Sequence, residues 1–257
     1  MCAMPKLYKT QGIVLKQMPL GEADRILTFY TPDIGKVRAV ARGIRRARSK
    51  LAGHLEPLAH VLVSVAQGRT LDTVTGVETA HSFRGLREDL QRVSVAVYLA
   101  ELVDGFTAEE SPNVHIFELL LDTLAQLQKT EAPAQLIRYF EVQLLWHSGF
   151  GPELFVCVEC ASKLEPEDHL YSCAKGGILC PRCRVSLSEA ALPISLNAIK
   201  VLRFFQREAH AKVAELNVGV ALLEEVARLL RTYVRYVLDR ELGSAEFMSL
   251  VASTTSR

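Results

Sequence analysis

The sequence lacks any long hydrophobic run, and no stretch approaches the roughly eighteen apolar residues that a membrane-spanning helix needs. Its first residues, Met1 to Lys9, turn polar before the apolar segment of a secretory signal forms. Low-complexity tracts and repeats of fixed period are missing as well. From these absences we expect a cytoplasmic protein that has no membrane partner and meets no oxidising compartment.

The motifs of nucleotide-driven motors and of zinc-dependent deaminases are also missing. Gly35-Lys36 has neither the glycine spacing nor the following Ser or Thr of a phosphate-binding loop. His54-Leu-Glu56 matches the H-x-E element of deaminases, but it lies far upstream of the C-x-x-C pairs, and no proline precedes either pair. We therefore expect a protein that is not an enzyme, with no catalytic residue and no small-molecule substrate.

Cysteines are few, but four of the six form two C-x-x-C pairs, Cys157 with Cys160 and Cys180 with Cys183, which nineteen residues separate. Each such turn points two thiolates at one place, and the spacing is typical of a four-sulfur zinc site. A reducing cytoplasm disfavours disulfides, so a metal site explains the pattern better than two cross-links. A four-cysteine ligand set is closed, so we expect one structural Zn²⁺ that stabilises its own lobe.

The two other cysteines have no C-x-x-C partner. We interpret Cys2 as an incidental thiol and Cys173, inside the connector, as a structural or spare thiol. An alternative ligand set that uses Cys173 stays open. Gly176 and Gly177 come shortly before the second pair, where the turn needs backbone freedom that a Cβ would deny.

Acidic residues are scarce in the first third of the chain. Residues 1–80 hold twelve Lys or Arg against six Asp or Glu, a net charge of +6, whereas residues 81–257 carry a net charge of −5. Seven cations fall within fifteen residues, and no acid lies between Asp33 and Glu56. Surfaces that only promote solubility mix both signs, so this block indicates contact with a phosphate backbone.

The block begins on a predicted strand, where alternation places Lys36, Arg38 and Arg42 on one face, and continues into a flexible loop. The predicted nucleic-acid-binding residues are Lys36, Arg38, Arg42, Arg45, Arg46, Arg48 and Lys50. Aromatic support is thin. Phe29 and Tyr30 point to opposite sides of one strand, so only one of them can lie on the open face, and Tyr8 is a further candidate for base stacking.

Short segments rich in β-branched residues, separated by Gly and Pro, predict five strands. They are Thr10–Gln17, Arg25–Thr31, Gly35–Ala41, Leu58–Ala66 and Arg69–Thr79. A longer connection between the third and fourth strands fits an OB-type barrel, and an SH3-like barrel fits the same pattern. After Thr79 the apolar period becomes helical, with helices expected over residues 86–100, 117–127, 134–146, 195–205 and 222–237.

The expected fold class is α+β and multidomain. A five-stranded OB-fold barrel occupies residues 1–80, an α-helical domain occupies residues 81–152 and 190–250, and a four-cysteine zinc lobe is inserted at residues 153–189. Arg228, Arg231 and Arg235 make a basic stripe on the last of the helices named above. We interpret this stripe as a solvated face, with Glu224 paired to Arg228 four residues later.

Several short segments in the first 57 residues stand out together. They are Gly12-Ile-Val-Leu15, Gly21-Glu-Ala-Asp-Arg-Ile-Leu27, Thr31-Pro-Asp-Ile-Gly-Lys36, Ala39-Val-Ala-Arg-Gly43, Ser49 and Leu55-Glu-Pro57. Together they resemble the N-terminal signature of the RecO family of bacterial recombination mediators. The four-cysteine segment with its Gly-Gly pair resembles the zinc lobe of the same family. The similarity covers nearly the whole chain in the expected order.

The resemblance implies an OB fold, a helical domain and a zinc lobe. It implies binding of single- and double-stranded DNA and annealing of complementary strands, in DNA repair and homologous recombination of the RecF type. Its implied partners are RecR and the single-strand-binding protein. The family helps to replace the coat of single-strand-binding protein on DNA with recombinase, at the nucleoid. The four zinc cysteines transfer residue by residue, whereas the DNA-contacting residues rest on charge and alternation. Some family members lack these cysteines, so the metal is not essential to the shared activity.

Two competing functions are also compatible with the cysteine pattern. A zinc-ribbon transcriptional regulator that reads duplex DNA predicts strong preference for one operator, although Glu165, Glu167 and Asp168 in the connector disfavour it electrostatically. An unrecognised zinc enzyme predicts a metal with a water ligand.

Overall fold

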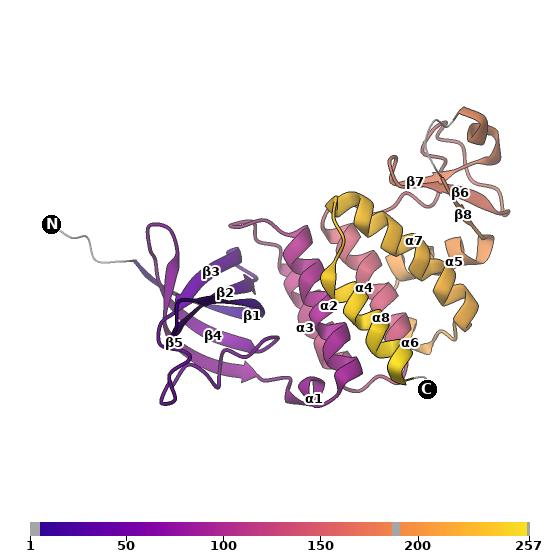
Figure 1. Cartoon of the computed structure of the whole chain (residues 1–257). Helices are drawn as coiled ribbons and strands as arrows, with labels where there is room; N and C mark the ends of the chain where they lie inside the picture. The colour runs from indigo at the N-terminus through magenta and orange to yellow at the C-terminus, as the bar shows by residue number, and fades with distance from the viewer. Residues whose placement is uncertain (1–5, 187–190, 256–257) are drawn as a thin grey trace. The chain divides into compact units, whose positions relative to one another are not determined.

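The computed structural model describes residues 6–186 and 191–255 (Figure 1). The described residues divide into two compact units, one within Met1–Lys129 and Leu242–Arg257 and the other within Thr130–Glu241. Cys2 and the end of the predicted zinc lobe, residues 187–189, lie outside the described residues. Within the described part of the chain, no helix has the length and hydropathy that crossing a membrane requires.

The first unit begins with a closed barrel of five strands in the order β1-β2-β3-β5-β4. The strands are β1 (Leu7–Leu20), β2 (Asp24–Thr31), β3 (Gly35–Ala41), β4 (His60–Ala66) and β5 (Asp72–His81). All neighbours pair antiparallel except β3 and β5, which are parallel. This order and the parallel pairing are those of the OB fold rather than of an SH3-like barrel. The predicted fold class, a barrel followed by helices, is confirmed.

Alternating apolar side chains fill the barrel. Val14, Leu27, Phe29, Val61 and Val65 are fully buried in a single core cluster, as the period of two predicts. Strand β2 departs from this pattern, because its last five residues are buried on both faces. The outer face is covered within the same unit.

Four helices complete the first unit: α1 (Arg84–Arg87), α2 (Leu90–Phe106), α3 (Val114–Leu127) and α8 (Gly243–Thr255). The sequence predicted one helix from Leu86 onward, but the structure separates α1 from α2. The separation occurs because Asp89 takes an extended conformation and its carboxylate caps α2, accepting from the N–H groups of Gln91 (2.8 Å) and Arg92 (3.1 Å).

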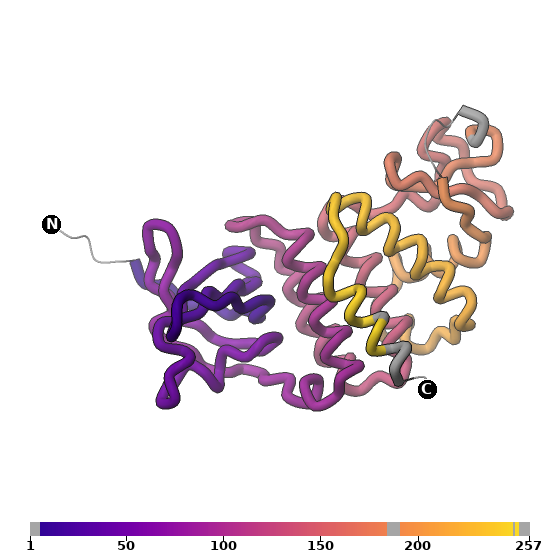
Figure 2. The backbone as a smooth tube through the Cα atoms, viewed as in Figure 1, coloured from indigo at the N-terminus to yellow at the C-terminus, as the bar shows by residue number. Residues whose placement is uncertain are grey.

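The C-terminal helix α8 packs along α2, although most of the chain separates them in sequence (Figure 2). The Glu101 carboxylate of α2 accepts hydrogen bonds from the backbone N–H of Ser244 (2.9 Å) and from the Ser244 hydroxyl, so it caps the first turn of α8. Helix α3 packs against the barrel: Tyr30 donates to the carbonyl of Asn113 (3.3 Å), and the rings of His60 and Phe117 meet edge to face, with their centroids 5.7 Å apart. These contacts explain why β2 is buried on both sides.

The second unit combines helices with a small sheet. Its helices are α4 (Pro133–His147), α5 (Leu196–Arg207), α6 (His210–Glu215) and α7 (Val220–Leu238), together with the 3₁₀ helix η1 (Pro181–Ser186). Strands β6 (His169–Ser172), β7 (Gly177–Leu179) and β8 (Leu192–Ile194) form a sheet in the order β7-β6-β8. Ser195 caps α5 as predicted, accepting from the N–H of Ala198 (3.1 Å).

The helices are therefore shared between the two units. Helices α2, α3 and α8 belong with the barrel, whereas α4 to α7 belong with the cysteine-bearing lobe. The helices expected to form one domain, at residues 81–152 and 190–250, are thus found in both units. The division into a barrel domain, a helical domain and a zinc lobe at residues 153–189 stays a prediction.

Candidate metal centre and nucleic-acid interface

The two C-x-x-C segments form tight turns at neighbouring places in the second unit. After the first pair, the N–H of Ala161 donates to the carbonyl of Cys157 (2.8 Å), and Ala161 has a left-handed backbone with φ of 55°. The second pair follows β7 and enters η1, where the N–H of Cys183 donates to the carbonyl of Cys180 (3.0 Å). Each turn brings its two thiols to the same side.

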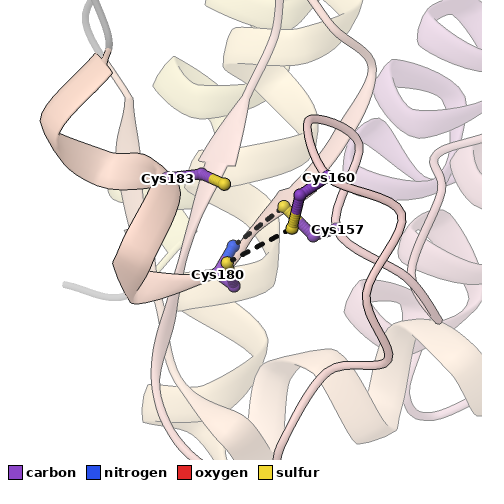
Figure 3. A group of neighbouring side chains, drawn as sticks. All are labelled: Cys157, Cys160, Cys180 and Cys183. Atoms are coloured by element: carbon purple, nitrogen blue, oxygen red, sulfur yellow. Dashed lines mark hydrogen bonds between the residues drawn. The ribbon is translucent and has the colours of Figure 1, made fainter.

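The four sulfur atoms all lie within 4.8 Å of one another (Figure 3). The Sγ atoms of Cys160 and Cys180 are 3.8 Å apart, and four sulfurs around a zinc at about 2.3 Å lie about 3.8 Å from one another. The N–H of Cys180 also donates to the Sγ of Cys157 (3.3 Å), which ties the second turn to the first. The residues present therefore fit a tetrahedral metal ion, and Cys173 is not part of the cluster.

The pKa values of two of these thiols also favour a cation at the centre of the cluster. Hydrogen bonds from Ser162 are the main cause that lowers the pKa of the Cys160 thiol, to about 6. The hydrogen bond with Cys160 is the main cause that raises the pKa of the Cys183 thiol, to about 12. Without a cation, one thiolate thus forms at the expense of its neighbour. A divalent ion would allow all four to ionise together.

The cysteine lobe is fastened to α7 through tyrosines. The Tyr233 hydroxyl donates to the carbonyl of Phe150 (3.0 Å), and the rings of Tyr171 and Tyr233 meet edge to face, 5.4 Å apart. A Cβ at Gly176, whose φ is 63°, would lie 2.9 Å from this hydroxyl, and a Cβ at Gly177 would lie 2.6 Å from the carbonyl of Glu153. The Gly-Gly pair is thus required for close approach as well as for the turn. Sequence reasoning placed Tyr233 on an apolar stripe but gave no signal for this role.

The basic block divides into two parts in the structure. In β3, Val37, Ala39 and Ala41 point into the barrel, so Lys36 and Arg38 lie on the outer face as alternation predicts. Arg42 follows the strand and begins a turn.

The first two cations are held by acidic side chains of the same unit. Lys36 Nζ lies 3.0 Å from Asp104 Oδ1 at the end of α2 and is only 12% exposed, and Arg38 lies 3.7 Å from Glu109. The segment after α2 runs beside β3, where the N–H of Glu110 donates to the carbonyl of Lys36 (3.4 Å). Lys36 and Asp104 are 68 residues apart, so no local pattern in the sequence could have revealed their pairing.

The remaining five cations lie on an ordered connection between β3 and β4. Ile44 at its start and Leu55 near its end are buried in the barrel core. Backbone hydrogen bonds hold the turns between them, including Arg46 N to Gly43 O (3.1 Å) and Ser49 N to Arg46 O (2.9 Å). The loop expected to be flexible is therefore folded onto the barrel. Gly43 allows this path because its φ is 66°.

These five side chains face the solvent and share one property, the absence of any ion-pair partner among residues 6–186 and 191–255. They are Arg42, Arg45, Arg46, Arg48 and Lys50. Of the seven predicted contact residues, these five are thus exposed and positively charged, without a bound carboxylate that phosphate must displace.

Neither aromatic ring of β2 lies on an open face of the barrel. Phe29 and Tyr30 are both fully buried, Phe29 in the barrel core and Tyr30 beneath the start of α3, so neither lies on an open face. Tyr8 is half-buried and donates to the Asp72 carboxylate (2.5 Å). Desolvation, followed by the hydrogen bond and charge of Asp72, raises the pKa of Tyr8. None of these three rings is therefore available for base stacking. What the barrel offers to DNA is the exposed cations described above.

Family models and relatives match both units of the chain. The model described as "Recombination protein O N terminal" matches residues 4–83, and "Recombination protein O C terminal" matches residues 87–246. The DNA repair protein RecO of Dehalococcoides mccartyi (strain CBDB1) is 39% identical over 237 residues, which is 92% of this chain and 93% of the relative.

Two further relatives carry the same description. The DNA repair protein RecO of Roseiflexus sp. (strain RS-1) is 39% identical and covers 95% of this chain and 85% of its own length. That of Symbiobacterium thermophilum is 35% identical over 96% of this chain and 98% of its own length. With the barrel, the helical region and the cysteine cluster all inside the matched residues, the chain belongs to the RecO family.

Proposed function

We propose that this chain is a non-enzymatic DNA-binding mediator of repair and recombination. It binds single- and double-stranded DNA through the basic loop, defined here as Arg42, Arg45, Arg46, Arg48 and Lys50, and anneals complementary strands. Together with RecR, it helps recombinase replace the single-strand-binding protein at the nucleoid. The relatives named DNA repair protein RecO support the process, and no chemical step is required of the chain.

One observation carries the proposal: the basic loop is exposed, ordered and without ion-pair partners among the described residues. Cations of this kind neutralise phosphates and release condensed counterions, which gives affinity with little dependence on sequence. Neutralising two strands on one protein lowers their mutual repulsion. Annealing then follows from charge and proximity rather than from catalysis.

We propose further that the four cysteines hold one structural Zn²⁺. Four thiolates at tetrahedral spacing suit a soft-ligand site for zinc, and a set of four protein ligands leaves no position for a reacting water. When bound, the ion neutralises the thiolates and cross-links the two turns. The residues of the lobe then hold Gly176 and Tyr171 against Tyr233 of α7.

Charge reversal in the basic loop tests the DNA-binding role. In an Arg45→Glu/Arg46→Glu variant we expect the affinity for single and double strands to fall by about tenfold or more at low salt, because two phosphate contacts become repulsive. Fluorescence anisotropy with labelled oligonucleotides across a salt series measures the change, and strand annealing is followed with the same oligonucleotides.

A matched control reverses two exposed cations of the same unit outside the barrel, Arg84→Glu/Lys129→Glu, and should bind DNA within about twofold of the parent protein. If the loop variant binds as well as this control, the basic loop is not the DNA-binding surface. A strong preference for one duplex sequence would instead identify a transcriptional regulator.

A further inference from the structure

We infer that the outer face of α7 is a second binding surface for a nucleic-acid strand, separate from the basic loop. The inference rests on the proposed function and adds a site in the second unit that annealing would use. The surface consists of Arg228, Arg231, Arg235 and Tyr236 and is called the α7 face below.

The spacing of these residues places them on one side of the helix. Positions 228, 231 and 235 recur at steps of three and four, which is the repeat of a single helical face. All three arginines are solvent-exposed. Arg228 and Arg235 are seven residues apart, or about 10 Å along the axis, a length that spans about three nucleotides at a rise of about 3.4 Å per nucleotide.

Only one of the three arginines of the α7 face has an ion-pair partner among the described residues. No acidic residue lies between Glu225 and Asp239. The pair of Glu224 with Arg228 expected from the sequence is absent from the ion pairs of the described residues, because spacing of four residues permits a pair without enforcing it. Arg235 does approach Glu241 (2.7 Å), but both side chains are more than 60% exposed. A pair this exposed is weak and can exchange its carboxylate for a phosphate.

An aromatic ring and a cavity complete the surface. Tyr236 is 55% exposed, although it is a large ring with an apolar face. Beside it a cavity of about 610 Å³ is lined by Arg235, Tyr236, Asp239, Arg240 and Glu241. Single-strand binding combines two elements: cations that hold the phosphate backbone, and an exposed aromatic ring on which a base can stack. Such a ring is what the barrel does not offer through Phe29 and Tyr30.

The opposite face of α7 is fixed, so the arginines project from a rigid support. Val226, Leu229 and Val234 are buried against the rest of the second unit. The Glu225 carboxylate accepts from the N–H (2.7 Å) and the hydroxyl (2.9 Å) of Ser195, and Tyr233 is held by the cysteine lobe. Ser195 thereby holds the Glu225 carboxylate, whereas Glu224 is exposed four residues before Arg228, and Asp239 and Glu241 line the adjoining cavity.

Two cationic surfaces, one in each unit, give annealing a physical basis. The basic loop binds one strand, and the α7 face binds a second strand by the same phosphate chemistry. A variant that lacks the α7 face should therefore keep its affinity for a first strand and lose the rate at which complementary strands pair.

The experiment compares Arg228→Glu/Arg231→Glu with Lys200→Glu/Lys212→Glu in the full-length protein. Both double variants reverse two exposed cations of the same unit, so their change in net charge is equal. We expect the α7 variant to bind a first labelled single strand within about twofold of the parent and to anneal complementary oligonucleotides about tenfold more slowly. The control should anneal within about twofold. Circular dichroism and thermal midpoints establish that both are folded, and Arg228→Gln/Arg231→Gln replaces the α7 variant if it is not.

If the α7 variant anneals at the rate of the control, the inference is overturned. This holds whatever result the basic-loop variant gives. So does an equal loss of annealing in both double variants, which would reflect net charge alone. Loss of first-strand binding in the α7 variant, with normal binding in the loop variant, would instead move the primary site to α7 and overturn the assignment of the basic loop. The two proposals can therefore fail separately.

Discussion

The cysteine cluster and the basic block are both short polar segments between regular elements, yet the structure treats them differently. The four cysteines converge so that all their sulfurs lie within 4.8 Å. The seven cations separate: Lys36 and Arg38 lie against Asp104 and Glu109, and the other five face the solvent. Ligands that belong to one metal are specified by their own spacing, whereas the role of a cation depends on which distant carboxylate the fold brings near it.

The largest effect is expected at the cysteine cluster. Replacement of one ligand, Cys157→Ser, should abolish binding of one zinc per chain, and a four-ligand site contributes on the order of 10 kcal/mol to the folding of its module at neutral pH. Metal analysis together with hydrogen exchange measures this. We expect protection to be lost in residues 153–186 and retained in the barrel strands. Because Tyr233 holds the lobe against α7, annealing should slow while first-strand binding persists.

A Cys173→Ser variant is the matched control, since Cys173 lies outside the cluster, and it should keep its zinc. Acidification gives a second test. Zinc release should increase as the pH falls, because protons compete for the thiolates. Loss of zinc from the Cys173 variant would reopen the choice of ligands.

An intermediate effect should separate the two halves of the basic block. Lys36 and Asp104 are 12% and 20% exposed. Lys36→Met leaves the Asp104 carboxylate with only Lys16, which is 4.0 Å away and 54% exposed, and should cost about 1 kcal/mol of stability. Arg46→Met should leave stability nearly unchanged and lower DNA affinity, with a salt slope on single strands shallower by about 0.7. Urea denaturation and anisotropy titrations measure the two quantities. A Lys36→Met protein of normal stability but weaker DNA binding would contradict this division.

The five strands of the barrel could be predicted from the sequence because the signals that mark a strand are local. Gly35–Ala41 was predicted to the residue, and the others differ from the structure mainly at their ends. Leu58 was placed in the fourth strand, but it has a φ of 69° and lies in the preceding turn, so β4 begins at His60. A β-branched run marks the body of a strand and not the backbone geometry at its boundary.

The sequence could not show which element covers the outer face of a barrel strand. Alternation correctly separates Phe29 from Tyr30, but it does not reveal that α3 buries the outer ring. It likewise places Lys36 on the outside without revealing the end of α2. The α7 stripe shows a different limit, because helical spacing permitted a Glu224–Arg228 pair that the fold does not form. The first two errors thus concern contacts between elements, and the third concerns a side-chain pair within one helix.

The smallest effect tests the boundary between the two parts of the block, at Arg38. Its side chain is 41% exposed and that of Glu109 is 61% exposed, so Glu109→Gln should change stability by no more than about 0.5 kcal/mol. Removing the carboxylate frees Arg38 for phosphate, so the salt slope on single strands should steepen by up to about 0.7 and the affinity should rise slightly. In an Arg38→Gln/Glu109→Gln double variant, both changes should disappear. If Glu109→Gln alone leaves the slope unchanged, Arg38 lies outside the surface that DNA occupies, and the basic loop begins at Arg42.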